Sequence, residues 1–79
     1  MPPAPDKVSE PKTIQIVLNG DSRAVPSGLN VLELLGKLGI DPERVAVELN
    51  RAIIRQTDWS ERQVEDGAVL EIVQFVGGG

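Results

Sequence analysis

The chain of 79 residues contains no cysteine and no histidine. Without cysteine there is no disulfide framework, no thiolate nucleophile and no thiolate ligand for zinc. Without histidine the chain lacks the side chain used most often as a general base and as a transition-metal ligand. Asp and Glu occur, but no pair suggests the carboxylate chemistry of glycosidases or aspartic proteases. We therefore expect no bound metal or cofactor and no autonomous catalysis.

Other scarcities narrow the choice of partners. Aromatic residues make up 3% of the chain, as Trp59 and Phe75, so a stacking platform for single-stranded nucleic acid is missing. The net charge of −4 argues against a surface that binds phosphates and favours a partner protein with a basic surface. No apolar run approaches the ~20 residues that span a bilayer, and residues 1–12 contain no hydrophobic stretch of the kind found in signal peptides. We expect a cytoplasmic protein with no nucleic-acid or membrane partner.

The proline content divides the chain. Residues 1–12 hold four of the six prolines, a composition that predicts an extended, disordered leader. Residues 13–75 carry the hydrophobic patterns of a single domain, and residues 76–79 are expected to form a flexible glycine tail.

The domain is predicted to open with a hairpin. Ile14, Ile16 and Leu18 occupy every second position, which places them on one face of a strand. Asn19-Gly20 then predicts a type I′ turn, because both central residues of that turn need a positive φ. A return strand over residues 22–26 follows, with Val25 toward the core.

A helix is expected next. Asn30 is suited to cap it and Glu33 to close a capping box, and Gly39 suits its left-handed end. Gly36 inside the helix costs roughly 1 kcal/mol relative to Ala, and the close approach of a strand would explain its presence. The apolar stripe of this helix consists of Val31, Leu34, Leu35 and Leu38.

The remaining segments complete a mixed sheet. We expect a capped turn at 41–44, strands at 45–49, 52–55 and 68–75, and an irregular connection at 56–64 through which Trp59 and Val64 cover the core. The order ββ-α-ββ-β places the first and last strands side by side, parallel and central. The predicted fold is therefore α+β, a β-grasp (ubiquitin-like) sheet of about five strands with one main helix packed on one face.

The C-terminal tail, Val76-Gly77-Gly78-Gly79, is the candidate functional group. Three glycines add nothing to a core and are costly to order, so the tail is either a frayed end or a segment that threads a partner's active site. A narrow tunnel that excludes water admits only residues without side chains. If the tail threads a partner's active site, the Gly79 carboxylate is the reacting group, and the partner enzyme activates it with ATP.

A second candidate site lies on the face of the sheet opposite the helix. Strand parity sends Val73 and Phe75 outward on the last strand and Val17 outward on the first. Exposed apolar residues are common, but a contiguous apolar patch beside a glycine tail favours docking of a partner protein.

Several motifs together resemble the ThiS family, the sulfur carriers of thiamine biosynthesis. They are Asn19-Gly20, the helix entry at residues 28–35, the strand at 45–50, the turn Asp66-Gly67, and the ending at 75–79. The resemblance covers residues 13–79. It implies that a ubiquitin-activating-like adenylyltransferase adenylates Gly79, and that a cysteine desulfurase or rhodanese-type donor supplies sulfur for a thiocarboxylate. Thiazole synthase then uses that sulfur for the thiazole ring.

Two other functions remain open at this point. The small subunit of molybdopterin synthase, or a carrier for another cofactor or for cysteine, shares the fold and tail chemistry; the ending Val73-Gln74-Phe75-Val76 lacks the proline typical of the molybdopterin family. A ubiquitin-like interaction module whose tail is never activated has the same fold.

Overall fold

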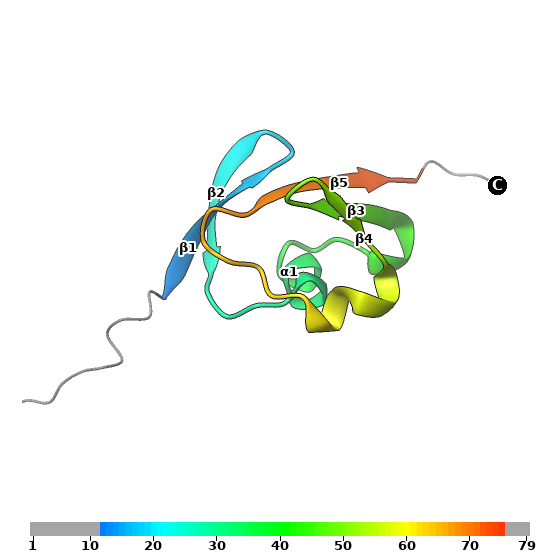
Figure 1. Ribbon diagram of the computed structural model, residues 1–79, viewed down its shortest axis with the longest axis horizontal. Helices are drawn as coiled ribbons and strands as arrows, with labels where there is room; N and C mark the ends of the chain where they lie inside the picture. The colour runs from blue at the N-terminus through cyan, green and yellow to red at the C-terminus, as the bar shows by residue number, and fades with distance from the viewer. Residues whose placement is uncertain (1–11, 76–79) are drawn as a thin grey trace, which may run out of the picture.

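The computed structural model describes residues 12–75, which form one sheet and its covering helices (Figure 1). The elements in chain order are β1 (Thr13–Leu18), β2 (Asp21–Pro26), α1 (Val31–Lys37), η2 (Pro42–Arg44), β3 (Val45–Leu49), β4 (Ala52–Ile54), η3 (Gln56–Glu61) and β5 (Val69–Gln74). This order and the mixed five-stranded sheet confirm the predicted β-grasp fold. The predicted leader, apart from Lys12, and the tail at 76–79 lie outside the described residues.

The sheet has the strand order β2-β1-β5-β3-β4. The first and last strands are parallel neighbours, with Val17 opposite Val69 and Leu18 opposite Leu70, as the element order predicted. β5 also pairs antiparallel with β3 over five residue pairs, from Val45↔Gln74 to Leu49↔Leu70. The strand that leads toward the C-terminus is therefore the middle strand of the sheet.

Local signals account for the predicted turn and helix ends. Asn19 and Gly20 have φ values of 49° and 87°, as a type I′ turn requires. Asn30 caps α1 through the Glu33 amide, and the Glu33 side chain returns to the Asn30 amide, so the capping box is present. At the other end Gly39 has φ 74°, and the Ile40 amide donates to the Leu35 carbonyl in a Schellman-type closure.

The explanation expected for Gly36 is wrong. A Cβ built at Gly36 meets no heavy atom within 4 Å, so no strand approaches this turn of α1 closely. Gly36 is exposed and has no positive φ, so neither packing nor backbone conformation requires glycine there.

Another correction concerns residues 56–61, which form the 3₁₀ helix η3 instead of an irregular connection. Short 3₁₀ segments have no extended apolar periodicity, so the sequence pattern did not reveal it. Burial of Trp59, whose indole Nε1 donates to the Ile54 carbonyl at 2.9 Å, fixes this segment beneath the sheet. Val64 is also buried, as predicted. The ends of β2, β4 and β5 differ from the predicted ones by a single residue each.

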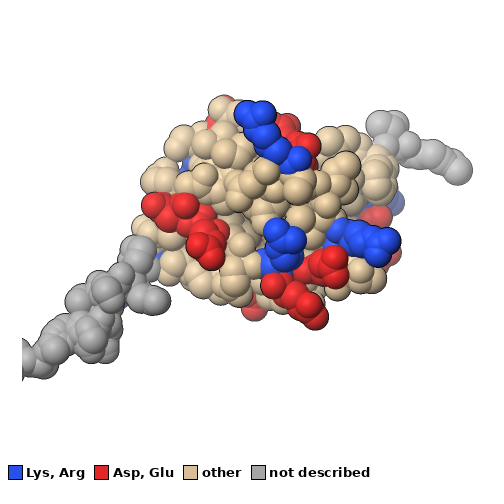
Figure 2. All heavy atoms as spheres, in the orientation of Figure 1, with Lys and Arg blue, Asp and Glu red and all other residues tan. Residues whose placement is uncertain are grey.

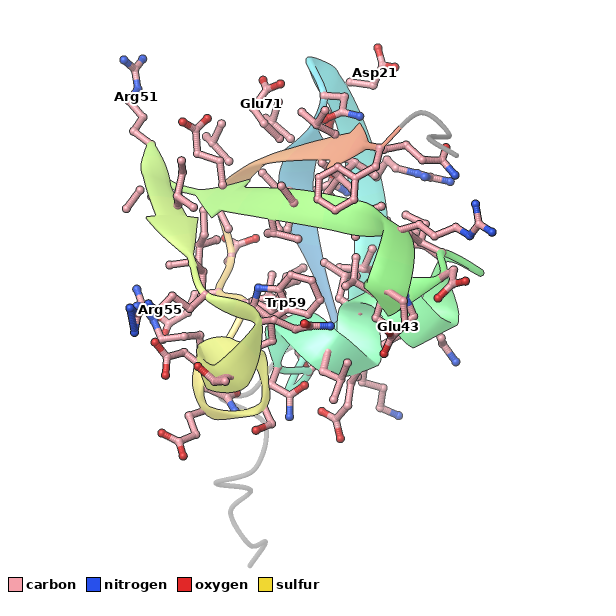
Figure 3. The ribbon with its side chains drawn as sticks, turned by 90° about the vertical axis from the view of Figure 1, so that its right-hand side faces the viewer. Asp21, Glu43, Arg51, Arg55, Trp59 and Glu71 are labelled. Atoms are coloured by element: carbon pink, nitrogen blue, oxygen red, sulfur yellow. The ribbon has the colours of Figure 1, made fainter. Side chains whose placement is uncertain are left out.

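The core lies between the sheet and the layer formed by α1 and η3 (Figure 1). Figure 3 shows Trp59 on this side of the sheet, while Glu71 and Arg51 rise from the other side. Among the described residues no polar or charged side chain is buried. The buried side chains are Ile14, Ile16, Leu18, Val25, Val31, Leu34, Leu35, Val45, Val47, Leu49, Ile54, Trp59, Val64, Ala68 and Leu70.

Candidate functional site

The strand that carries the tail is held by its neighbours up to its last residue. The Phe75 amide donates to the Arg44 carbonyl at 2.8 Å, so regular pairing with β3 continues just past the end of β5. The predicted tail residues Val76, Gly77, Gly78 and Gly79 begin directly after this bond and lie outside the described residues. Phe75, the last described residue, is therefore held in place at one end of the central strand.

Asn19 holds β5 from the β1 side, where backbone pairing between the two strands ends. Its Oδ1 accepts a hydrogen bond from the Ile72 amide at 2.7 Å, and its Nδ2 donates to the Ile72 carbonyl at 3.2 Å. The Asn19 side chain thus replaces the backbone of a longer β1. Asparagine can do this while remaining in the left-handed conformation of the turn, which it tolerates better than most residues.

Asn50 makes a similar contact from the β3–β4 turn, on the opposite side of β5. The backbone amide of Asn50 donates to the Val69 carbonyl at 2.7 Å, and its side-chain Oδ1 accepts from the Val69 backbone amide at 2.9 Å. Asn50 also has a positive φ, 51°. The sequence revealed both asparagines only as turn residues, because their contacts with β5 depend on which strands become neighbours.

The structure separates the residues of the predicted apolar patch. Val73 and Phe75 are 60% and 57% exposed. Strand parity places both near the C-terminal end of β5, on the face of the sheet that α1 and η3 do not cover, called the open face below. Val17 is half-buried and lies opposite Val69 instead, four residues before Val73, or about 13 Å along the strand. Val73 and Phe75 are therefore brought together, and Val17 lies away from them.

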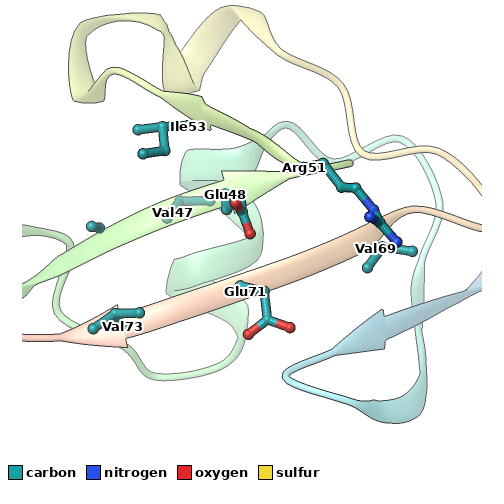
Figure 4. Close-up of a pocket in the computed structure, with 8 residues that line it drawn as sticks. Val47, Glu48, Arg51, Ile53, Val69, Glu71 and Val73 are labelled. Atoms are coloured by element: carbon teal, nitrogen blue, oxygen red, sulfur yellow. The ribbon is translucent and has the colours of Figure 1, made fainter.

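A wider apolar surface lies on the same open face, extending from β5 over the neighbouring strands β3 and β4. Ile53 is 78% exposed and Val69 39% exposed on this open face. They border a shallow groove of about 500 Å³, drawn in Figure 4, whose lining side chains also include Ala46, Glu48, Arg51, Glu71 and Val73. Sequence reasoning missed Ile53 and Ala46, although their outward parity on β3 and β4 was the available signal.

Charged groups are distributed without a basic surface on the face shown in Figure 2, where blue and red side chains are interspersed. Within residues 12–75 no group of three or more Asp or Glu side chains is placed to hold a metal ion. No helix in that part of the chain is long and apolar enough to cross a membrane.

The comparisons with known proteins decide the family. The family model described as "ThiS family" matches residues 16–79, most of the chain and all of its C-terminal glycines. The chain belongs to the ThiS family. This assignment confirms the resemblance that the motifs indicated.

Individual relatives agree with the family assignment. The chain is 35% identical to the crystal structure of a thiamine biosynthesis protein (ThiS) from Geobacter metallireducens, with a TM-score of 0.73 over 84% of this chain and 100% of that one. It is 34% identical to "Sulfur carrier protein ThiS" of Thermus thermophilus, over 78% of this chain and 95% of that protein.

A third relative is much longer. The chain is 42% identical over 66 residues to "Thiazole synthase" of Paramagnetospirillum magneticum, which covers 84% of this chain and 20% of that protein. A second thiazole synthase, from Magnetococcus marinus, shares the same proportions at 35% identity. The chain thus spans about a fifth of the length of these curated relatives.

Proposed function

We propose that this ThiS-family chain is a sulfur carrier in thiamine biosynthesis and that the Gly79 carboxylate is the group that carries the sulfur. The observation that carries the proposal is the family match, which extends through Gly77, Gly78 and Gly79. The names of the Thermus relative and the Geobacter structure, sulfur carrier and thiamine biosynthesis protein, point to the same role.

The proposed chemistry takes place in partner enzymes. A Gly79 carboxylate oxygen attacks the α-phosphorus of ATP and displaces pyrophosphate, which gives an acyl-adenylate. The terminal sulfur of a persulfide, supplied by a cysteine desulfurase or rhodanese-type donor, then attacks the carbonyl carbon and displaces AMP. A thiol reduces the resulting acyl disulfide, releasing the thiocarboxylate and leaving a disulfide behind. The adenylate must be shielded from water, which a closed tunnel around the tail provides.

The fold suits a carrier that supplies reach and no catalytic groups of its own. β5 is fixed by strands on both sides and by Asn19 and Asn50, so an enzyme that grips the folded domain also determines where the tail begins. Prior positioning of the domain lowers the entropic cost of bringing the carboxylate to ATP. The adenylating enzyme is proposed to be similar to the ubiquitin activators.

Thiazole synthase is the proposed acceptor of the sulfur. Two relatives named thiazole synthase each contain, within a much longer chain, a segment similar to this one. Joining a carrier to its acceptor raises their effective concentration, which is advantageous if the two must meet in every cycle. This observation also favours thiamine over molybdopterin as the product pathway.

Mass spectrometry of the protein isolated from its own cells tests the proposal. We expect a species heavier by the exchange of one oxygen for sulfur, located at Gly79, and ATP–pyrophosphate exchange when the adenylating enzyme is added. A variant with one residue appended after Gly79 is the control: it should melt like the unmodified protein but support no exchange. The absence of both thiocarboxylate and exchange in the unmodified protein contradicts the proposal and favours a module whose tail is not activated.

A reconstituted assay then separates the two carrier pathways. The thiocarboxylated chain is mixed with thiazole synthase or with the large subunit of molybdopterin synthase, each with its own small-molecule substrates. Sulfur transfer only in the first mixture is the expected result, and transfer only in the second assigns the chain to the molybdopterin pathway.

A further inference from the structure

Two carboxylate side chains face each other at the centre of the open-face groove. Glu48 on β3 lies directly opposite Glu71 on β5 in the antiparallel register, and Figure 4 shows both side chains on the same side of the sheet. Side chains in directly opposed positions have Cβ atoms about 4.5–5.5 Å apart, and like charges there destabilise a sheet. This pair therefore opposes folding.

Nothing in the described chain neutralises the pair. Neither carboxylate forms an ion pair or a hydrogen bond among residues 12–75. Arg51 lies at the turn end of the groove, and in Figure 4 its side chain extends toward Val69 instead of entering the space between the two glutamates. The sequence did not draw attention to this pair, because Glu48 and Glu71 are 23 positions apart and meet only through the β3–β5 register.

Apolar side chains surround the two glutamates. The next pair toward the tail on this face is Ala46 opposite Val73, and Ile53 on β4 is paired with Glu48. When a partner covers this face, the apolar side chains exclude water and strengthen the attraction between the charged pair and an incoming opposite charge. The groove thus combines an unneutralised double negative charge with an apolar rim, which complements a basic side chain flanked by apolar ones.

We infer that Glu48 and Glu71 together receive an arginine or lysine side chain of the adenylating enzyme when the open face docks on that enzyme. The inference rests on the proposed function, because it assumes that an enzyme takes the tail. Gly79 lies six positions after Val73, a span of at most about 20 Å, so an active site that holds Gly79 lies within that distance of the groove. An enzyme that binds the tail is therefore close enough to contact this face.

Charge disfavours the other occupants of this face. A second copy of the chain docked with this pair on a twofold axis would bring carboxylates against carboxylates. Nucleic acid would bring phosphates to the same pair. An enzyme surface with a basic residue is the occupant whose charge is complementary.

The test exploits the opposed effects expected on stability and on binding. In Glu71→Lys the new ammonium group faces Glu48 across the strands, so the melting temperature should rise. The same change fills the acceptor site with a positive charge, and affinity for the purified adenylating enzyme, measured by calorimetry without ATP, should fall by about tenfold or more. Both the melting temperature and the affinity of Glu71→Gln should lie between those of wild type and Glu71→Lys. Raising the salt concentration should weaken wild-type binding more than binding of Glu71→Gln.

Glu61→Lys is the matched control. It introduces the same change in net charge on exposed η3, which packs with α1 on the covered side of the sheet. Its affinity should stay within about twofold of wild type. Binding of Glu71→Lys at wild-type affinity overturns the inference, and so does an equal loss in Glu61→Lys, which reflects net charge alone.

ATP–pyrophosphate exchange separates failure of this inference from failure of the proposed function. If Glu71→Lys supports exchange with an unchanged KM for the carrier, the docking inference fails while the function stands. If wild type supports no exchange at any carrier concentration, the proposed function fails together with the inference.

Discussion

The two faces of the sheet are made from the same strands and carry opposite kinds of side chain. On the covered face, Ile16, Val47 and Leu70 are buried under α1 and η3, and no polar side chain of the described chain is buried with them. On the open face, alternate residues of β3 and β5 place Glu48 against Glu71 beside exposed Val69 and Val73. The covered face is explained by packing alone. The open face includes a pair that opposes folding, which packing does not explain and which the proposed docking on the adenylating enzyme does.

The largest change in the free energy of unfolding should come from a substitution on the covered side of β5. Leu70 is fully buried, so Leu70→Ala should lower the free energy of unfolding by about 3 kcal/mol through lost burial and a residual cavity. Val69→Ala, one residue earlier and on the open face, should change it by less than about 1 kcal/mol. Urea denaturation of both variants measures the contrast, and equal losses would mean that the open face is also part of the core.

A smaller loss in the free energy of unfolding is expected when the Asn19 side chain no longer bonds to β5. Asn19→Gly keeps the positive φ of the turn but removes both side-chain hydrogen bonds to Ile72, and should cost about 1–2 kcal/mol. Asn19→Ala should cost more, because it also disfavours the left-handed turn. Hydrogen exchange of the Ile72 amide should accelerate in both variants relative to the Leu70 amide. Unchanged protection at Ile72 would show that Asn19 acts only as a turn residue.

A gain of stability is expected on the helix. Gly36 has open space around its missing Cβ and no positive φ, so Gly36→Ala should raise the free energy of unfolding by about 1 kcal/mol. Thermal melting measures it. Because the helix lies on the covered side, affinity for the adenylating enzyme should not change; a loss of affinity would extend the docking surface to α1.

The smallest effect on folding should come from the exposed end of β5. Phe75→Asp replaces a side chain that is 57% exposed, so the free energy of unfolding should change by less than about 1 kcal/mol. Affinity for the adenylating enzyme should nevertheless fall, because an apolar contact beside the tail is replaced by a charge. Gln74→Asp introduces the same charge one residue earlier, on the opposite side of the strand, and should bind more tightly than Phe75→Asp. Equal affinities of the two variants would remove Phe75 from the docking surface.

Local signals explain what was predictable. The turn at Asn19-Gly20, the capping box of Asn30 and Glu33, and the end of α1 at Gly39 each depend on residues within a few positions of one another. Strict alternation in β1 and β3 identified their buried sides, because a strand turns successive side chains to opposite faces. Signals of this kind failed at η3, whose six residues lack a period, and at Gly36, where the sequence offered no measure of nearby space.

The sequence by itself therefore determined the five strands and α1, their buried sides, the family motifs and the position of the glycine tail after the last strand. Only the tertiary structure decided which outward residues meet. It set Val17 against Val69 and away from Val73, brought the Asn19 side chain to Ile72, and opposed Glu48 to Glu71. These pairs join segments far apart in the chain, and their register follows from how the shared core packs, which no local pattern encodes. The tail could be identified from the sequence, whereas the surface proposed to dock beside it forms only when the sheet folds.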